Sequence, residues 1–367
     1  MKLVVLGLSL SSSWGNGHAT TFRGLLGEFA TRGHDILFLE RDVPWYASQR
    51  DLADPDYCRL SFYSDLKDLE RWQGEIARAD AVMVGSYVPQ GVDVGRFVQQ
   101  TARGVTAFYD IDTPVTLAKF ARGDFEYLSP ELIPGFDVYL SFTGGPTLRF
   151  IERELGSPGA RALYCQADPA IYRPLDVPSR WDLSYLGTWS EDRQPTVEKL
   201  LCAAARALPE RRFCVAGPLY PGDIEWPANV ERIEHVPPAE HPDFYAASRF
   251  TLNVTRADMI AAGWSPSVRL FEAAMCGCPV ISDVWDGLDQ LFEPGREILL
   301  ARTTEDVVAA LEGIAPAQAR AIGEAARVRA LAEHTSAVRA GELERHLEEA
   351  MVGKHTAALA GEGWTEA

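Results

Sequence analysis

The residues best suited to bind an anion lie at the predicted start of a short helix. Ser265 is a good N-cap and Pro266 suits the first helical position, so the sequence predicts a helix that starts here and ends at Gly277. The backbone N–H groups near Ser267 and Val268 would then be unpaired, at the positive end of the helix dipole. Such a helix start can bind a phosphate whatever the net charge of the protein.

A single carboxylate follows on the same helix. Glu272 lies four residues after Val268, about one turn further along the same face. The rise between them is roughly 6 Å, about the separation of a diphosphate and a ribose. The alternative is that Glu272 is an ordinary solvated carboxylate on a helix surface. Spacing alone leaves both interpretations open.

Two arginines in the same half of the chain could meet a phosphate. Arg256 follows a predicted strand over 250–254, at the carboxyl edge where open α/β sheets bind ligands. Arg269 is a weaker candidate, because charged residues on a helix commonly face water. Since the net charge is −17, any anionic ligand must meet local cations of this kind.

A second group of candidates follows the first predicted strand, where Gly15-Asn16-Gly17-His18 opens a helix. A dinucleotide fingerprint would need glycine at position 20, which is Thr20, so NAD binding is not expected. Gly15 and Gly17 would instead let the backbone approach a sugar or a diphosphate. His18 could transfer a proton or bind a sugar, or it could be only a cap or surface residue.

Two carboxylates follow a buried strand predicted over 105–109. Asp110 and Asp112 stand just before the next helical pattern, so one of them is expected to cap that helix. Asp112 could also accept the proton of an attacking hydroxyl, or bind the acceptor that carries it. These three roles stay open.

Alternating apolar strands and amphipathic helices must position these residues. Helical patterns such as 20–32 and 66–79 separate the strands, which is typical of parallel α/β units. The strands are predicted at 3–8, 35–39, 81–84, 105–109 and 138–142, and in a second series at 183–186, 213–216, 230–233, 250–254, 279–281 and 297–300.

The length of 367 residues exceeds that of one ordinary core of ~100 to 150 residues, so two domains are expected. We place the first domain at 1–168, a proline-rich linker at 169–180 and the second domain at 181–335. A helix over 336–352 is long enough to pack back on the first domain, and a tail over 353–367 is expected to be disordered.

The composition excludes several classes of protein. The hydrophobic fraction of 47% and charged fraction of 24% are typical of soluble domains, and neither a membrane span nor a signal peptide is evident, so a cytoplasmic location is expected. The net charge of −17 argues against a nucleic-acid partner. Asp283, Asp286 and Asp289 match no metal-binding pattern, so no metal site is predicted.

Several motifs resemble those of a known family. The run 268–281 is similar to the C-terminal nucleotide-binding signature of GT-B glycosyltransferases, and specifically to the CgeB-like group of bacterial glycosyltransferases. The resemblance covers most of the chain, with further matching motifs at 11–18, 109–114, 185–193 and 285–288.

This resemblance implies an α/β protein with GT-B architecture, in which two Rossmann-like parallel-sheet domains face a central cleft. It implies that Glu272 contacts the donor ribose and that Arg193 approaches the diphosphate, although Arg193 could instead be a surface residue paired with Glu191 or Asp192. The wider superfamily has a Glu-x7-Glu pair, whose first position is Trp264 here. A carboxylate contact to the transferred sugar is therefore not implied.

The sequence thus predicts a glycosyltransferase that moves a sugar from a nucleoside diphosphate sugar to an unidentified hydroxyl-bearing acceptor. The donor is a substrate, and no further cofactor and no metal are expected. His18 and Asp112 would face the acceptor, and the resemblance favours retention of the anomeric configuration. The alternatives are a nucleotide-sugar epimerase or hydrolase of the same fold, and a non-catalytic nucleotide-sugar-binding protein.

Overall fold

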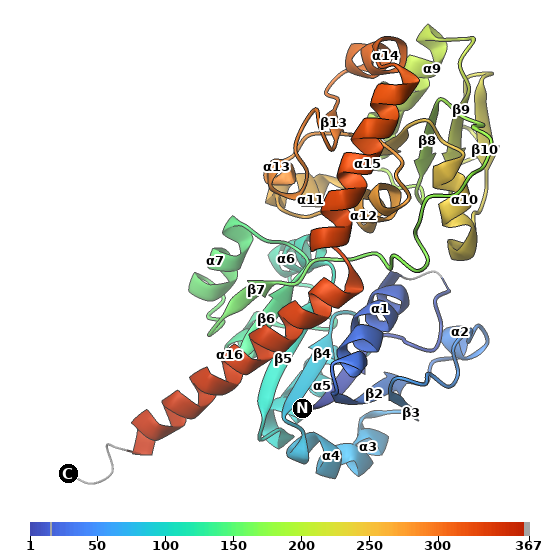
Figure 1. Cartoon of the computed structure of the whole chain (residues 1–367). Helices are drawn as coiled ribbons and strands as arrows, with labels where there is room; N and C mark the ends of the chain where they lie inside the picture. The colour runs from blue at the N-terminus through green and yellow to red at the C-terminus, as the bar shows by residue number, and fades with distance from the viewer. Residues whose placement is uncertain (15–16, 363–367) are drawn as a thin grey trace. The chain divides into compact units, whose positions relative to one another are not determined.

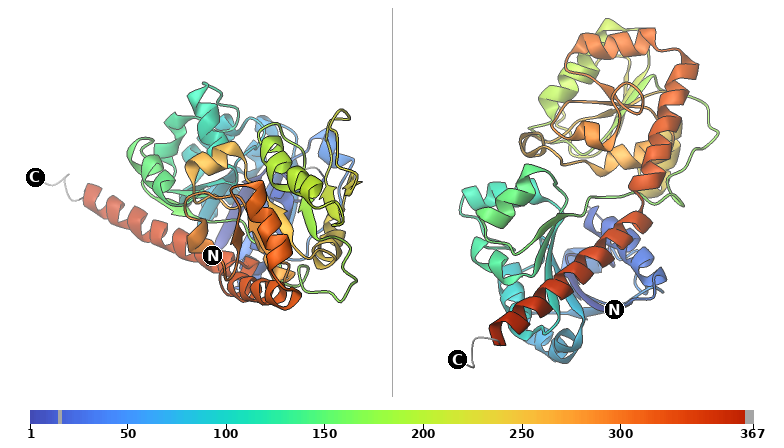
Figure 2. Two further views of the ribbon diagram at one scale, coloured as in Figure 1. Left: turned by 90° about the horizontal axis from the view of Figure 1, so that it is seen from above. Right: turned by 60° about the vertical axis from the view of Figure 1, so that its left-hand side comes forward.

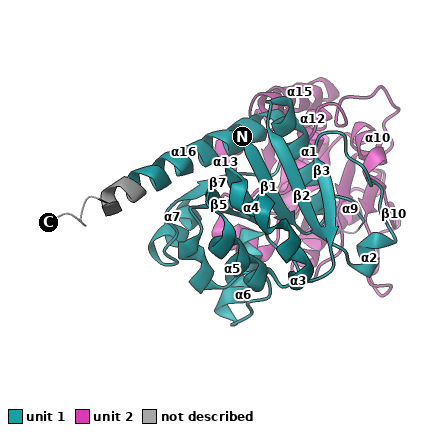
Figure 3. Cartoon of the chain, turned by 90° about the horizontal axis from the view of Figure 1, so that it is seen from below, with its two compact units in different colours: residues 1–165, 336–367 teal, residues 166–335 magenta. Residues whose placement is uncertain are grey.

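The chain forms two compact units, each built around its own sheet (Figure 1, Figure 3). The computed structural model describes residues 1–14 and 17–362, with side chains as far as residue 356. Unit 1 comprises Met1–Cys165 and Ser336–Ala367, and unit 2 comprises Gln166–Thr335. The segment 169–180, predicted to be a linker, belongs to unit 2.

Unit 1 contains a seven-stranded sheet in the order β3-β2-β1-β4-β5-β6-β7. All neighbouring strands run parallel, which confirms the predicted α/β class. The strand order changes direction between β1 and β4, and open α/β sheets bind ligands at the carboxyl ends of such neighbours. The strands are β1 (Lys2–Gly7), β2 (Asp35–Arg41), β3 (Arg59–Tyr63), β4 (Ala81–Gly85), β5 (Val105–Asp110), β6 (Val138–Ser141) and β7 (Ala160–Ala162).

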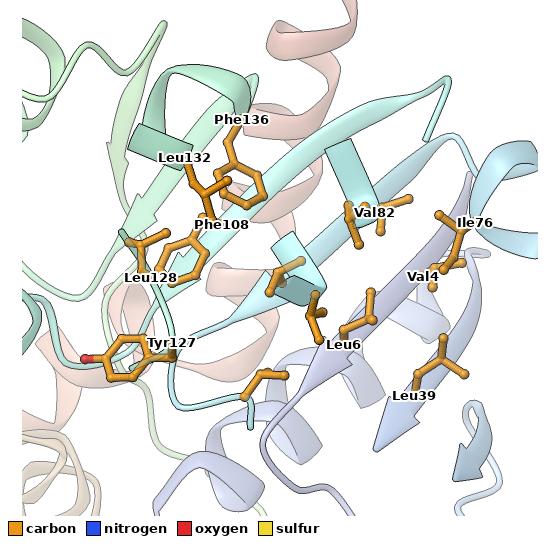
Figure 4. Close-up of a cluster of buried hydrophobic side chains, with 14 of the residues drawn as sticks. Val4, Leu6, Leu39, Ile76, Val82, Phe108, Tyr127, Leu128, Leu132 and Phe136 are labelled. Atoms are coloured by element: carbon orange, nitrogen blue, oxygen red, sulfur yellow. The ribbon is translucent and has the colours of Figure 1, made fainter. Parts of the chain in front are cut away.

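Both faces of this sheet are buried, because apolar residues occupy successive positions along its central strands. Val4 and Leu6 lie in the cluster shown in Figure 4, whereas Leu3 and Val5 lie in a second cluster. The helices of unit 1 are α1 (Gly17–Thr31), α2 (Pro44–Ala47), α3 (Leu66–Leu69), α4 (Gln73–Arg78), α5 (Gly91–Thr101), α6 (Thr113–Ala121), α7 (Pro146–Arg153) and α16 (Ser336–Glu362), with 3₁₀ turns η1 (Glu70–Trp72) and η2 (Pro130–Gly135).

The long helix α16 returns the chain to unit 1. It lies beside α1 (Figure 2), and its Leu343 and Leu347 are fully buried in the same cluster as Leu3 and Val5. It continues to Glu362, beyond the end predicted at residue 352.

Unit 2 contains a six-stranded parallel sheet in the order β10-β9-β8-β11-β12-β13, so its strand order changes direction between β8 and β11. The strands are β8 (Leu183–Leu186), β9 (Phe213–Ala216), β10 (Val230–Ile233), β11 (Thr251–Asn253), β12 (Val280–Ser282) and β13 (Leu299–Leu300). The helices are α8 (Gln194–Val197), α9 (Ala203–Ala207), α10 (His241–Ala246), α11 (Ala257–Ala262), α12 (Val268–Met275), α13 (Leu288–Leu291), α14 (Thr304–Gly313) and α15 (Pro316–Glu333), with the π-helical turn η3 (Glu198–Cys202) and the 3₁₀ turn η4 (Pro238–Glu240).

The strands that the sequence analysis missed are the two edges of the first sheet. β3 is only partly buried along most of its length, and β7 has three residues. Neither gives the apolar run that marks a central strand of a parallel sheet. The two edges do not position the candidate residues, which follow central strands.

Candidate active site

The carboxyl ends of β8 and β11 carry two of the predicted arginines. Arg193 lies in the segment that connects β8 to α8, and Arg256 follows β11 as the residue before α11. β8 and β11 are neighbours in the sheet, and the chain continues from β8 toward one edge of the sheet and from β11 toward the other. Open α/β sheets bind ligands at the carboxyl ends of such a pair of strands.

Arg193 is held by neutral oxygen atoms. Its Nε donates to Ser190 Oγ at 2.8 Å and its Nη2 to the Thr188 carbonyl at 2.5 Å. Burial lowers the pKa of Arg193, and the charges of Arg269 and Arg256 lower it further. It makes no ion pair with a carboxylate of the described chain, so the alternative of a pair with Glu191 or Asp192 does not describe this structure.

Arg269, the weaker candidate cation from the sequence, does not face water. Its side chain is buried, with Nε donating to the Leu186 carbonyl at 2.5 Å and Nη1 donating to Asn253 Oδ1 at 3.0 Å. The physical reason is that seven of the eight residues of α12 are buried, so this helix has no solvent face. A guanidinium has five N–H donors, and these contacts leave several unused.

Three guanidinium groups therefore gather at one sheet edge, where Arg269 is buried, Arg193 is half-buried and Arg256 is exposed. Asp192 is the nearby carboxylate, and the charges of Arg256 and Arg193 help to lower its pKa. Within the described residues, no acidic oxygen lies within ion-pair distance of Arg193, Arg256 or Arg269. Asp283 influences Arg269 electrostatically, but it accepts hydrogen bonds from Thr255 N–H and Oγ1, both at 2.7 Å, and burial raises its pKa. The buried positive charge of Arg269 has no ion-pair partner among the described residues, and such a charge is costly unless an anion binds beside it.

Helix α12 starts two residues later than the sequence predicts. The N-cap is Ser267 rather than Ser265, and α12 begins at Val268. Ser267 Oγ does not cap the helix but donates to Asn253 Oδ1 at 2.8 Å, and Trp264 N–H donates to the Asp286 carbonyl. These contacts hold the preceding segment extended, and the first N–H groups of α12 lack intrahelical acceptors.

Glu272 is buried rather than solvated. Tyr172 Oη donates to its Oε1 at 2.7 Å, Tyr245 Oη donates to its Oε2 at 3.1 Å, and His241 Nδ1 lies 3.7 Å from Oε2. Burial alone would raise the pKa of Glu272, but His241 and the two tyrosines outweigh it and the pKa is lowered. A carboxylate has about four acceptor positions, so these partners leave limited capacity for a ribose hydroxyl.

Trp264 replaces the first carboxylate of the superfamily pair, and its indole ring is packed in place. A Cβ atom at Gly287 would lie 2.4 Å from that ring, so only glycine fits beneath it. The indole Nε1 donates to Gln290 Oε1 at 2.9 Å. Trp264 itself has a left-handed backbone, with φ of 43°.

In unit 1, the connection that follows β1 is fixed by one buried carboxylate. Glu40, in β2, accepts from the N–H groups of Leu10 and Ser11 at 2.6 and 2.9 Å. Glu40 therefore fixes the backbone of the connection that follows β1. Gly15 lies outside the described residues, and Gly17 begins α1 with open space where a Cβ would stand.

His18 is buried near the start of α1. Its Nδ1 atom has no hydrogen-bond partner among the described residues, and its ring meets the ring of Tyr87 edge-on at 5.2 Å. Burial lowers the pKa of His18 to about 4, so the imidazole is neutral near pH 7. A neutral imidazole can accept a proton or bind a hydroxyl, but it cannot supply positive charge to a phosphate.

Asp112 lies beyond the end of β5, at the N-cap position of α6, but its side chain does not cap the helix. Tyr87 Oη donates to its Oδ2 at 3.2 Å. Asp110 is fully buried and accepts from Tyr139 Oη and Thr116 Oγ1. Burial raises the pKa of Asp110 to about 6. The two carboxylates thus differ, since Asp110 is part of an internal network and Asp112 is only partly buried.

Tyr87 is a residue that the sequence analysis missed. It follows β4, the strand beside β1, and has a left-handed backbone with φ of 61°. Such strain in a non-glycine residue is common at functional sites. Its position after a predicted strand at the carboxyl edge was the available signal. It connects His18 with Asp112, so three side chains from three connections meet at this edge.

The described residues contain no group of three or more His, Cys, Asp or Glu side chains that could hold a metal ion. Of the helices described, none is long and apolar enough to cross a membrane.

Comparison with known proteins adds to this geometry. Residues 193–345 match the model of a family described as glycosyl transferase-like. That segment includes Arg193, Arg256, Arg269 and Glu272. No curated protein matches the sequence.

Similar solved structures cover almost the entire chain. Sucrose-phosphate synthase from Thermosynechococcus elongatus has a TM-score of 0.69 and 17% identity, with 95% of this chain and 100% of that chain covered. The Anabaena protein Alr3699/HepE in complex with UDP has a TM-score of 0.71 and 14% identity, with the same coverage of 95% and 100%. Two Rossmann-like parallel sheets and these neighbours show that the chain has the GT-B fold of glycosyltransferases.

Proposed function

We propose that this chain is a glycosyltransferase that moves a sugar from a nucleoside diphosphate sugar to a hydroxyl-bearing acceptor. The observation that carries the proposal is the gathering of Arg193, Arg256 and Arg269 at the carboxyl edge of the unit 2 sheet, where none of them forms an ion pair with a carboxylate of the described chain. A leaving diphosphate is the anion that such a group would stabilise. The match of residues 193–345 to a glycosyl transferase-like family supports this reading.

In this mechanism unit 2 binds the donor. The N–H groups at the start of α12, near Ser267 and Val268, and the three guanidiniums stabilise the negative charge that develops on the diphosphate. Glu272, held by Tyr172 and Tyr245, binds the ribose with its remaining acceptor capacity. UDP is a reasonable nucleotide to test first, because Alr3699/HepE was solved with UDP and with UDP-glucose.

In unit 1, Asp112 accepts the proton of the attacking hydroxyl, with Tyr87 fixing the orientation of its carboxylate. His18 contributes a neutral ring nitrogen that binds a hydroxyl group. Gly17, and Gly15 beyond the described residues, leave room for the backbone to approach the substrate. The motif around Glu272 supports a place in the CgeB-like group.

Donor binding tests the proposal directly. Thermal unfolding of the full chain with UDP, GDP, ADP and their sugars should show stabilisation by at least one of them, by roughly 2.7 kcal/mol at 100 times the dissociation constant. Arg193→Gln should abolish the shift, and Arg180→Gln should keep it, because Arg180 is exposed and paired with Glu231. If no nucleotide stabilises the protein, the proposal fails.

The reaction should also proceed without a divalent metal, since guanidinium groups supply the positive charge. Turnover of the donor should be unchanged in EDTA, and loss of turnover that Mg²⁺ or Mn²⁺ restores would contradict this. Resemblance to the Glu-x7-Glu enzymes favours retention, although Trp264 replaces the first Glu. The coupling constant of the anomeric proton in the product decides between retention and inversion.

Donor consumption separates the alternatives. An epimerase or hydrolase of this fold would change or cleave the donor with no acceptor present, whereas a non-catalytic binding protein would bind nucleotide without turnover. A transferase should release nucleotide faster when its acceptor is added.

A further inference from the structure

Unit 1 contains a cavity of about 470 Å³ that the proposed mechanism does not use. One wall is the first turn of α5, with Asp93 and Arg96. The other is formed by the loop that includes Phe125 and Ser129, and by Glu131 at the start of η2. All of these residues belong to unit 1.

The cavity lies beside two connections, and one of them carries Tyr87, which donates a hydrogen bond to Asp112. The segment after β4 contains Tyr87 and then leads into α5, and the loop before η2 contains Tyr127, whose ring lies 4.6 Å from that of Tyr87. A Cβ at Gly91 would lie only 2.4 Å from the Tyr127 carbonyl oxygen, so the two connections are packed tightly. The cavity therefore adjoins the segment whose Tyr87 orients the proposed base.

Ser129 is a polar group prepared for a ligand. It is 7% exposed, stands at the N-cap position of η2 without capping it, and its hydroxyl has no hydrogen-bond partner among the described residues. A buried hydroxyl without a partner is unfavourable, by about 1 to 3 kcal/mol in general. A hydroxyl or amine of a bound molecule would satisfy it.

The charge of the cavity disfavours an anion. Its lining holds the carboxylates of Asp93, Glu126 and Glu131 against the single guanidinium of Arg96, which is already paired with Asp93 at 3.2 Å. Glu126 is paired with Lys119, but Glu131 is exposed and has no partner in the described part of the chain. Asp93 also complements the positive end of α5. A phosphate or carboxylate would meet unpaired negative charge here.

Phe125 supplies the apolar surface. Its ring is 45% exposed and lines the cavity. An aromatic face beside a carboxylate and a hydroxyl suits a sugar ring, which has apolar C–H faces and hydrogen-bonding edges.

We propose that this cavity binds the acceptor, and that the acceptor is a neutral or amine-bearing sugar rather than a sugar phosphate or a uronic acid. This inference rests on the proposed function, because it names the substrate class of the same reaction. The sugar packs on Phe125, with its hydroxyl or amine groups on Ser129 and Glu131.

Saturation-transfer NMR on the full chain tests the inference with defined probes. Methyl α-glucoside and methyl α-glucosaminide should bind, with the amine at least as tight, and glucose 6-phosphate and methyl glucuronoside should not. Phe125→Ala and Glu131→Gln should each weaken binding of the glucosaminide about tenfold. Their matched controls in unit 1 are Phe150→Ala, whose ring is also 45% exposed, and Glu154→Gln, and these should change nothing.

The outcomes separate the two proposals. If the anionic sugars bind as well as the neutral one, or if the Phe125 and Glu131 variants bind the probes like their controls, the acceptor assignment is overturned. UDP binding is measured in the same samples and reports only on the donor site, so it tests the proposed function independently of the acceptor assignment. If UDP fails to bind while the sugar probes do, the proposed function is lost but the cavity remains a sugar site.

Discussion

The carboxyl edges of the two sheets have the same topology and different charge. In unit 2, the edge at β8 and β11 holds guanidinium groups, and the hydrogen bonds described for Arg193 and Arg269 go to neutral oxygens. In unit 1, the edge at β1 and β4 holds neutral His18, Tyr87 and the carboxylate of Asp112. One Rossmann-like scaffold can therefore serve an anionic ligand or an uncharged one, depending on a few residues that follow its strands.

The largest effect should come from the cationic edge. Arg269→Gln should lower donor turnover by about 10² to 10³, because it removes a fixed charge from the leaving diphosphate. Arg269→Lys should keep part of the activity, because it keeps the charge but loses the two fixed contacts. Steady-state kinetics measures the turnover of each variant, and calorimetry measures its dissociation constant for UDP. Arg180→Gln is the control. If Arg269→Gln left UDP binding and turnover unchanged, the positive charge of the unit 2 edge would have no role in donor binding, and the proposed contrast between the two edges would be wrong.

Asp112→Asn in unit 1 should lower turnover by about 10², as expected for loss of a general base. The donor dissociation constant should not change, because Asp112 belongs to unit 1. Calorimetry with UDP and single-turnover kinetics distinguish the two parameters. A large loss of UDP affinity in this variant would place Asp112 in the donor site and contradict the proposed division.

The stability of unit 1 should respond to pH through two groups of opposite sign. Burial lowers the pKa of His18 to about 4, so between pH 6.5 and 4 only the unfolded chain binds its proton, and falling pH destabilises the fold. Burial raises the pKa of Asp110 to about 6, so the stability it contributes is present below pH 3.8 and is lost as pH rises through 6. Each contribution is at most about 3 kcal/mol.

Hydrogen exchange of peptides from α1 and β5, corrected for the intrinsic rate, measures these contributions at pH 4.5 and 7. His18→Gln should reduce the loss of protection at low pH, whereas Asp110→Asn should reduce the loss of protection at higher pH. Peptides from unit 2 are the internal control, because both groups lie in unit 1. If both variants changed the pH dependence of protection in the same way, His18 and Asp110 would not have opposite effects on stability.

The smallest effect should come from Ser267→Ala. It removes the hydrogen bond from Ser267 Oγ to Asn253 Oδ1, worth about 1 kcal/mol, while the backbone N–H groups of α12 stay in place. UDP affinity should fall by only about threefold. A loss comparable to that of Arg269→Gln would mean that the hydroxyl, rather than the helix start, binds the phosphate.

The fold and the strand ends that carry several of the candidate residues could be predicted, because both depend on local patterns. Apolar runs gave the central strands, and the residues that follow them, such as Arg256 and Asp112, are placed by the parallel topology alone. The burial of Arg269 could not be predicted in this way, because the helix that carries it is surrounded by protein on all sides. For this reason, a charged residue on this helix cannot be assigned to a solvent-facing side from the sequence pattern.

Contacts between distant segments were also beyond the sequence. The carboxylate of Glu272 is bonded by Tyr172 and Tyr245 and lies near His241, which all come from other elements. No spacing rule connects these positions. The left-handed backbone of Tyr87 likewise depends on the packing of neighbouring connections rather than on its own residue type.

Helix α16 has a consequence for how the protein is made. Residues 166–335 are continuous in the chain, so unit 2 can fold as soon as it has left the ribosome. Unit 1 cannot be completed at that stage, since the apolar cluster of Leu3 and Val5, which α1 covers in part, also contains Leu343 and Leu347 of α16. Part of the apolar face of the first half therefore stays uncovered until the last helix has been synthesised.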